Sequence, residues 1–119
     1  IPLPATYSTA FQEICCSDCN ELLVARSGDD IIGCLQVTFI PYLTFKGGRR
    51  ALLEGVRVAT DRRAEGIGRS LVQEAIERAR RRHCHMVQLT SDKSRPEAIR
   101  FYKALGFEAT HEGLKLTIQ

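Results

Sequence analysis

The spacing of apolar residues predicts one helix and three strands in the first half of the chain. Residues 5–19 place apolar side chains at helical spacing. Two aliphatic stretches, 21–26 and 31–40, have the composition of β-strands, and the Ser-Gly-Asp-Asp turn between them predicts a hairpin. A third strand is predicted at 51–59. The segment 41–50 contains Pro, two Gly and three basic residues, so it is predicted to be a loop.

A long amphipathic helix dominates the second half of the chain. Its apolar stripe lies opposite charged residues and consists of Ile67, Leu71, Val72, Ala75, Ile76 and Ala79. A strand at 86–90 follows, and then a second helix that Ser94 caps and Gly106 ends. The last predicted strands are 107–111 and 114–118. This order indicates an α/β (mixed α+β) domain with a mixed sheet, whose third and fourth strands run parallel because a helix joins them.

Composition and charge exclude several classes of protein. The 119 residues suit one domain, and 44% apolar with 26% charged residues can form an ordinary core. No run approaches the roughly 18 apolar residues that span a bilayer, so no membrane association is predicted. The net charge of +3 is too scattered to indicate nucleic-acid binding. Five cysteines without a secretory signal predict reduced thiols in a cytoplasmic protein, and their spacing predicts no metal site.

The loop between the third strand and the long helix carries the candidate chemistry. Gly66 and Gly68 stand at the start of the helix, where missing Cβ atoms let a ligand approach the backbone. The first amides of a helix lack internal partners, and the helix dipole adds positive potential, so this end suits a pyrophosphate. The spacing matches neither the P-loop nor the dinucleotide fingerprint. The alternative is that the glycines only form a tight turn.

Two motifs resemble those of the GCN5-related N-acetyltransferase (GNAT) family. The first, Gln/Arg-x-x-Gly-x-Gly/Ala, is met by Arg63, Gly66 and Gly68. The second, Ala-x-x-x-Tyr-x-x-x-Gly-Phe, is met by residues 98–107. The resemblance covers residues 21–119, and the family's usual first strand and first helix are not among the elements expected in this sequence.

The resemblance implies that residues 1–119 form a single GNAT-like domain, whose mixed sheet is split at its centre and flanked by helices. The pantetheine arm of acetyl-CoA would pair with a strand backbone like an added strand, and its pyrophosphate would lie on the helix amides. No metal is expected. The residues expected to bind acetyl-CoA are Val56, Arg57, Val58, Arg63, Ala64, Glu65, Gly66, Ile67, Gly68, Arg69, Ser70, Arg95 and Tyr102.

The implied reaction is direct attack of a neutral primary amine on the acetyl thioester. Amines of the lysine type are mostly protonated near pH 7, so a base helps. Tyr102 matches the family tyrosine that lies near the CoA sulfur, and it is the expected acid for the leaving thiolate. Glu54 is the expected base, because it is a carboxylate within an apolar strand beside the presumed acetyl group. A water chain, His85 and His111 are the alternatives.

Several points stay open. The strand period puts Glu54 on the face of Leu52 and Val56, unless a bulge at Gly55 changes its face. Arg95 stands where relatives often carry an Asn that contacts the pantetheine, so this contact differs here.

A non-catalytic acyl-CoA-binding sensor or regulatory domain is the alternative function. The acceptor is open among small amines, antibiotics, amino acids and protein N-termini, and a homodimer is compatible with the family.

Overall fold

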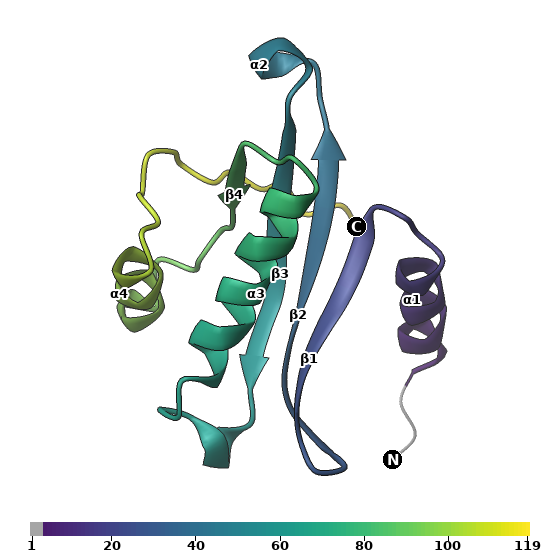
Figure 1. The fold of residues 1–119 in the computed structure, drawn as a ribbon, viewed down its shortest axis with the longest axis vertical. Coiled ribbons are helices and arrows are strands. Elements are labelled where there is room, and N and C mark those ends of the chain that lie inside the picture. The colour runs from purple at the N-terminus through teal and green to yellow at the C-terminus, as the bar shows by residue number, and fades with distance from the viewer. Residues whose placement is uncertain (1–3) are drawn as a thin grey trace. The chain divides into compact units, whose positions relative to one another are not determined.

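The computed structural model describes residues 4–119, which divide into two compact units. The first unit ends at Gln88 and the second runs from Leu89 to Gln119, and each is described in its own frame. The first unit holds a sheet of order β1-β2-β3-β4 (Figure 1). Its strands are β1 (Asn20–Ser27), β2 (Asp30–Pro41), β3 (Arg49–Val58) and β4 (Met86–Gln88).

The pairing of these strands makes the sheet mixed. β1 with β2 and β2 with β3 are antiparallel, whereas β3 and β4 are parallel. The helix α3 (Ile67–Arg81) joins β3 to β4. The predicted hairpin and the predicted parallel pair are therefore both confirmed.

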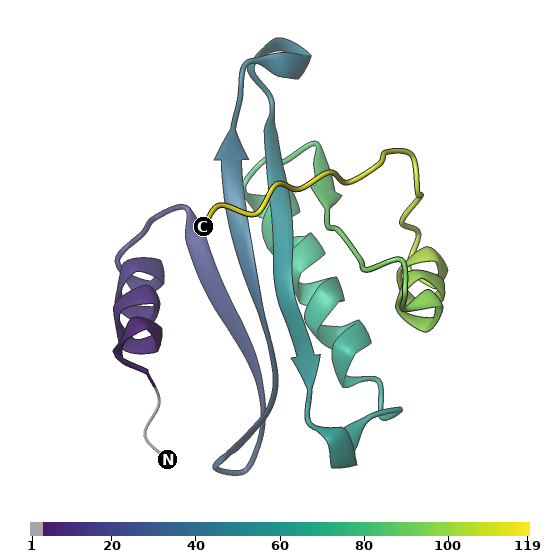
Figure 2. The same cartoon turned by 180° about the vertical axis from the view of Figure 1, so that it is seen from behind.

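The core lies between α3 and one face of the sheet. Figures 1 and 2 show α3 lying across the strands, with α1 (Ala5–Cys15) beside β1. Alternate residues of β2 are buried on the α3 face, as the period of two in a strand requires. The buried apolar side chains are Leu23, Leu35, Val37, Phe39, Ala51, Leu53, Leu71, Val72, Ala75 and Ala79.

Gly33 of β2 allows α3 to approach the sheet closely. A Cβ at this position would lie 3.0 Å from Cγ2 of Ile67 and 3.1 Å from Cδ1 of Leu71. It would also lie 3.2 Å from the carbonyl oxygen of Arg57. Glycine at this point therefore fixes the distance between the first turns of α3 and the strands.

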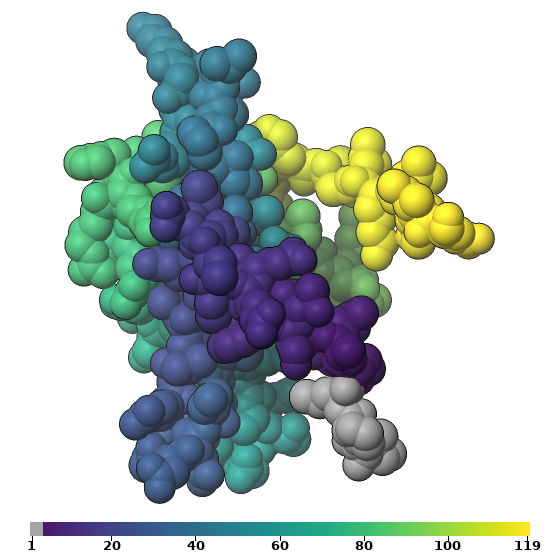
Figure 3. Space-filling model, turned by 90° about the vertical axis from the view of Figure 1, so that its right-hand side faces the viewer, coloured from purple at the N-terminus to yellow at the C-terminus, as the bar shows by residue number. Residues whose placement is uncertain are grey.

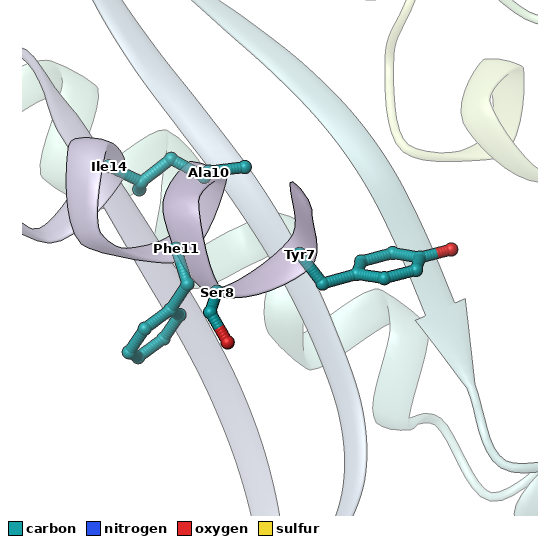
Figure 4. A pocket seen from close by; sticks show the side chains of 5 residues that line it. All are labelled: Tyr7, Ser8, Ala10, Phe11 and Ile14. Atoms are coloured by element: carbon teal, nitrogen blue, oxygen red, sulfur yellow. The ribbon is translucent and has the colours of Figure 1, made fainter. Parts of the chain in front are cut away.

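The helix α1 ends at Cys15, before the predicted limit at residue 19. The turn at Cys16 and Ser17 ends it, and their amides still bond to carbonyls of the helix. None of its side chains is fully buried. A shallow hollow on its surface is lined by Tyr7, Ser8, Ala10, Phe11 and Ile14 (Figure 4).

The segment between β2 and β3 is shorter than the predicted loop 41–50. The strands reach Pro41 and Arg49, and a single helical turn, α2 (Thr44–Gly47), forms the tip. Phe45 and Lys46 adopt left-handed φ values of 55° and 60° within this turn. Such conformations are costly for residues with a Cβ and are kept only where the surroundings enforce them.

The second unit contains α4 (Pro96–Ala104). The prediction that Ser94 caps this helix is wrong. Arg95 is the N-cap residue, and Ser94 instead donates from its amide and hydroxyl to the carboxylate of Asp92, at 2.9 and 2.8 Å. This local turn competes with capping, since a serine hydroxyl serves either geometry. The predicted end at Gly106 is confirmed by its φ of +103°.

The predicted strands 107–111 and 114–118 are not formed in the structure. No strand is assigned in the described residues after β4. Leu114, Leu116 and Ile118 alternate as strand residues would, yet they are 94%, 89% and 90% exposed. Alternation shows which side chains could share a face, but a strand also needs a neighbour for its backbone hydrogen bonds.

Candidate active site

A bulge interrupts β3 beside the candidate base. Gln36 of β2 pairs with Glu54. The neighbouring pair joins Cys34 to Arg57, so two residues of β3 oppose one of β2. Gly55 lies in this bulge with φ of +63°, a left-handed conformation that glycine adopts without steric cost. The bulge changes the face on which the later residues of β3 lie.

The bulge places Glu54 and Val56 on opposite faces of the sheet. Leu53 is buried on the α3 face, and Glu54 next to it is exposed on the other face. Beyond the bulge, Val58 pairs with Gly33, which faces α3. Glu54 therefore shares the face of Leu52, as the simple alternation predicts. Val56 lies on the opposite face, toward α3, because the bulge shifts the alternation.

β3 and β4 pair over a short length only. The parallel pairs are Arg50 with Met86, Ala51 with Val87 and Leu52 with Gln88. From Leu53 to Val58, β3 has no strand partner on this side among the described residues. A free edge offers backbone N–H and C=O groups that an extended molecule can pair with. The predicted cofactor residues Val56, Arg57 and Val58 lie along this free edge.

The loop after β3 leads into the N-terminus of α3. A 3-10 turn (Thr60–Arg62) follows the strand, and Ala64 and Gly66 then adopt left-handed φ values of 67° and 82°. Gly66 is the N-cap residue, and no side chain caps the helix. The amide of Ser70 donates the first helical bond, to the carbonyl of Gly66 at 3.0 Å. The amides of Ile67, Gly68 and Arg69 therefore precede the helical ladder, as anion binding requires.

The surroundings of this helix end fit an anionic group. The first turn of α3 contains no acidic residue, and a Cβ built on Gly66 would meet no atom within 4 Å. Arg62 pairs with Glu65 at 3.1 Å, so this arginine is already neutralised. Within residues 4–119, Arg63 and Arg69 form no ion pair. These two arginines are the cations that can add to the helix end.

The candidate acid Tyr102 lies in the second unit, on α4. Its ring contacts Phe101 and Phe107 edge-on, with centroids 5.1 and 5.7 Å apart. Partial burial raises the pKa of Tyr102, and the positive charge of Arg95 opposes this in part. The phenol therefore stays protonated throughout the neutral range, which suits a proton donor.

Arg95 also belongs to the second unit. Its side chain is exposed and lies 3.8 Å from a carboxylate oxygen of Glu97. The structure thus brings Glu54 and the residues from Val56 to Ser70 together in the first unit. It brings Arg95 and Tyr102 together in the second.

Sequence reasoning missed a polar row beside Glu54. Asn20 accepts hydrogen bonds from Gln36 at 3.1 Å and from Thr38 at 2.6 Å. Because Gln36 pairs with Glu54, this row lies on the same face as the candidate base. The polar positions alternate with buried ones along β2, but only the strand register shows that they adjoin Glu54.

Other site classes find little support in the described part of the chain. No three His, Cys, Asp or Glu side chains in residues 4–119 are gathered as metal ligands. The five cysteines are free thiols. None of the helices in these residues has the length and apolarity needed to cross a bilayer.

Three features define the class of protein, a mixed α/β acetyltransferase fold. They are the mixed sheet, the separation of β3 from β4 beyond Leu52, and the uncapped N-terminus of α3. The model of the Acetyltransferase (GNAT) family matches residues 2–107. The chain belongs to this family, as its two motifs predicted.

Known structures and relatives agree with this assignment. A transcriptional regulator from Bacillus halodurans C-125 is 56% identical, with a TM-score of 0.96 over 98% of this chain and 78% of that one. A putative acetyltransferase from Agrobacterium tumefaciens C58 is 24% identical, with a TM-score of 0.90 over 98% of this chain and 81% of its own. The second likeness shows the fold alone.

A curated relative shares part of its length with this chain. The L-methionine sulfoximine/L-methionine sulfone acetyltransferase of Pseudomonas aeruginosa is 28% identical over 87 residues. These make up 73% of this chain and 49% of the relative. The chain thus spans about half the length of the curated relatives it matches.

Proposed function

We propose that the chain is an acetyl-CoA-dependent N-acetyltransferase that moves an acetyl group to a primary amine by direct attack. The observation that carries the proposal is the free edge of β3, which leads from the Gly55 bulge to the open amides of α3. This path offers strand-like pairing to the pantetheine and a helix end to the pyrophosphate. Family membership supports the same cofactor.

Each candidate residue has a defined part in the proposed reaction. The free edge and the α3 amides bind and orient acetyl-CoA, which supplies the thioester. Glu54, directly or through water, takes the proton that the attacking amine loses as the new N–C bond forms. Tyr102 gives its phenol proton to the sulfur as the C–S bond breaks. The proposal includes a cytoplasmic location and leaves a homodimer open.

Calorimetry of acetyl-CoA, desulfo-CoA and ATP tests the cofactor assignment. We expect acetyl-CoA to bind far more tightly than ATP, and Gly66→Glu to abolish the binding. The new carboxylate would repel the pyrophosphate at the helix end. Gly28→Glu is the matched control, because Gly28 has a similar φ of +61° and open surroundings but lies in the β1–β2 turn. Equal losses in both variants, or no binding to the wild type, would contradict the assignment.

A second candidate is a non-catalytic acyl-CoA-binding regulatory domain. The observation that favours it is the 56% identity to a transcriptional regulator. An amine panel separates the two candidates by acceptor-dependent thiol release. The panel includes L-methionine sulfoximine and L-methionine sulfone, since the Pseudomonas relative acts on these amino-acid derivatives. Acetyl-CoA binding without release on any amine would favour the regulatory domain.

A further inference from the structure

The tip of the β2–β3 hairpin carries positive charge that nothing in its own unit neutralises. We call residues 42–50 the basic hairpin; its cations are Lys46, Arg49 and Arg50. Within residues 4–119, none of the three forms an ion pair. There is no Asp or Glu anywhere from residue 31 to residue 53. The positive potential here is therefore open to an external anion.

The nearby arginines at the C-terminal end of α3, Arg81 and the C-cap residue Arg82, are paired instead. Arg81 lies 3.4 Å from a carboxylate oxygen of Glu74, and Arg82 lies 3.8 Å from one of Glu21. Their charges are already compensated. Compared with these two arginines, the three cations of the basic hairpin are uncompensated among the described residues.

Arg50 is held in place at the base of the hairpin. Its guanidinium carbon lies 4.5 Å from the centroid of the Tyr42 ring. The Tyr42 hydroxyl is hydrogen-bonded to Nε2 of His85, and the two rings stack with centroids 5.6 Å apart. The ring of Phe45 lies 4.7 Å from that of His85. The Tyr42 ring fixes the plane of the guanidinium, whose terminal nitrogens are the donors that a ligand would use.

Two further observations indicate that this arrangement serves binding. Nε of Arg50 is buried and has no hydrogen-bond partner in the described part of the chain, although such donors are normally satisfied. Phe45 and Lys46 hold left-handed conformations that cost energy. Figure 3 shows the tip, the blue-teal segment at the top, projecting above the purple helix α1.

Arg50 and Glu54 belong to the same face of β3. They are four residues apart before the bulge, so their Cα atoms are separated by roughly 13 Å. An extended chain of three residues spans about 10 Å. One acceptor of that length can place its amine at Glu54 and an anionic group at Arg50.

We propose that the basic hairpin binds a carboxylate of the acceptor, so that the substrates are short peptide-like amines with a free carboxylate rather than polycations. This inference rests on the proposed acetyltransferase function. The guanidinium of Arg50 matches a carboxylate through two parallel N–H donors. Lys46 and Arg49 strengthen the field around it.

A matched pair of acceptors tests the proposal, namely alanyl-glycyl-glycine as the free acid and as its C-terminal amide. Thiol release gives kcat/KM for each, and calorimetry in the presence of CoA gives the affinity of each. We expect the acid to be preferred about tenfold, as for one partly screened charge-assisted contact. Spermidine should be a poor acceptor. The preference should shrink as salt is raised.

Variants locate the preference on the hairpin. Arg50→Gln should reduce the acid-to-amide ratio of kcat/KM to about two or less. Lys46→Asn should reduce the wild-type ratio by about half, and Asn tolerates the left-handed conformation at this exposed position. Arg81→Gln is the control, since this arginine is exposed and paired on α3, and it should leave the ratio unchanged. Lys46→Asn keeps the test decisive if Arg50→Gln does not fold.

Equal use or equal binding of acid and amide by the wild type would overturn the proposal, and so would binding of neither. A preference that survives in both hairpin variants would overturn it as well. Failure of acetyl-CoA itself to bind would instead overturn the acetyltransferase function. The two failures are therefore distinguishable.

Discussion

The positive φ of Gly55 predicts a defined energetic cost for Gly55→Ala. A Cβ at this position would meet no atom within 4 Å, so the cost comes only from the backbone conformation. The left-handed conformation costs an L-residue about 1–2 kcal/mol, and the stiffer unfolded chain of alanine recovers part of it. We expect a net loss of about 1 kcal/mol, which lowers Tm by roughly 3–6 °C in a chain of this size.

The chain has no cheaper way to avoid this strain. Removing the bulge would restore the simple alternation and turn Arg57 toward α3, next to Leu71. Burying an unpaired guanidinium costs several kcal/mol, so the variant should keep the bulge. Gly55→Asn should cost less than Gly55→Ala, because Asn tolerates left-handed φ.

Thermal and urea unfolding measure the cost, with Gly28→Ala as the matched control. Gly28 has a φ of +61° and equally empty surroundings, so the two alanine variants should lose similar stability. Acetyl-CoA should raise the Tm of Gly28→Ala as it does that of the wild type. It should raise the Tm of Gly55→Ala less, because Gly55 lies in the bulge of β3, the strand proposed to pair with the pantetheine. If Gly55→Ala lowers the free energy of unfolding by less than about 0.3 kcal/mol, the left-handed conformation of Gly55 is refuted. If it lowers that free energy several times more than Gly28→Ala does, the open surroundings of Gly55 are refuted.

Three further predictions follow from the core and the two catalytic candidates. Leu35→Ala should lower the free energy of unfolding by about 2–5 kcal/mol in urea, since this side chain is 1% exposed, and an effect under about 1 kcal/mol would contradict the described core. Glu54→Gln should reduce kcat/KM at pH 7 by about 10²–10⁴-fold without changing acetyl-CoA affinity. The activity should recover as pH rises, because the amine then loses its proton without a base. An unchanged rate would exclude Glu54 as the base. Tyr102→Phe should lower kcat more than it lowers acetyl-CoA affinity. Because burial raises the pKa of Tyr102, the donor is lost only as pH rises above about 10, so the wild type should decline there and the variant should not.

The sequence by itself determined the elements whose signal is local. The stripe from Ile67 to Ala79 predicts α3, and α3 is found at Ile67–Arg81. The turn at residues 27–30 and the two aliphatic stretches around it predict the β1–β2 hairpin, which is formed. The two motifs predict the family, because the spacing of Arg63, Gly66 and Gly68 can be recognised within one short segment of the sequence. Periodicity and motif spacing need no knowledge of distant residues.

Tertiary structure decided everything that depends on pairing between distant residues. The face of Glu54 follows from the register with Gln36 and from the bulge at Gly55. The free edge exists because β4 pairs with β3 only as far as Leu52. The unbalanced charge of the basic hairpin became visible only when Arg81 and Arg82 proved to be paired with Glu74 and Glu21. Alternation alone predicted strands at 107–111 and 114–118, but a strand forms only where a neighbouring backbone accepts its hydrogen bonds.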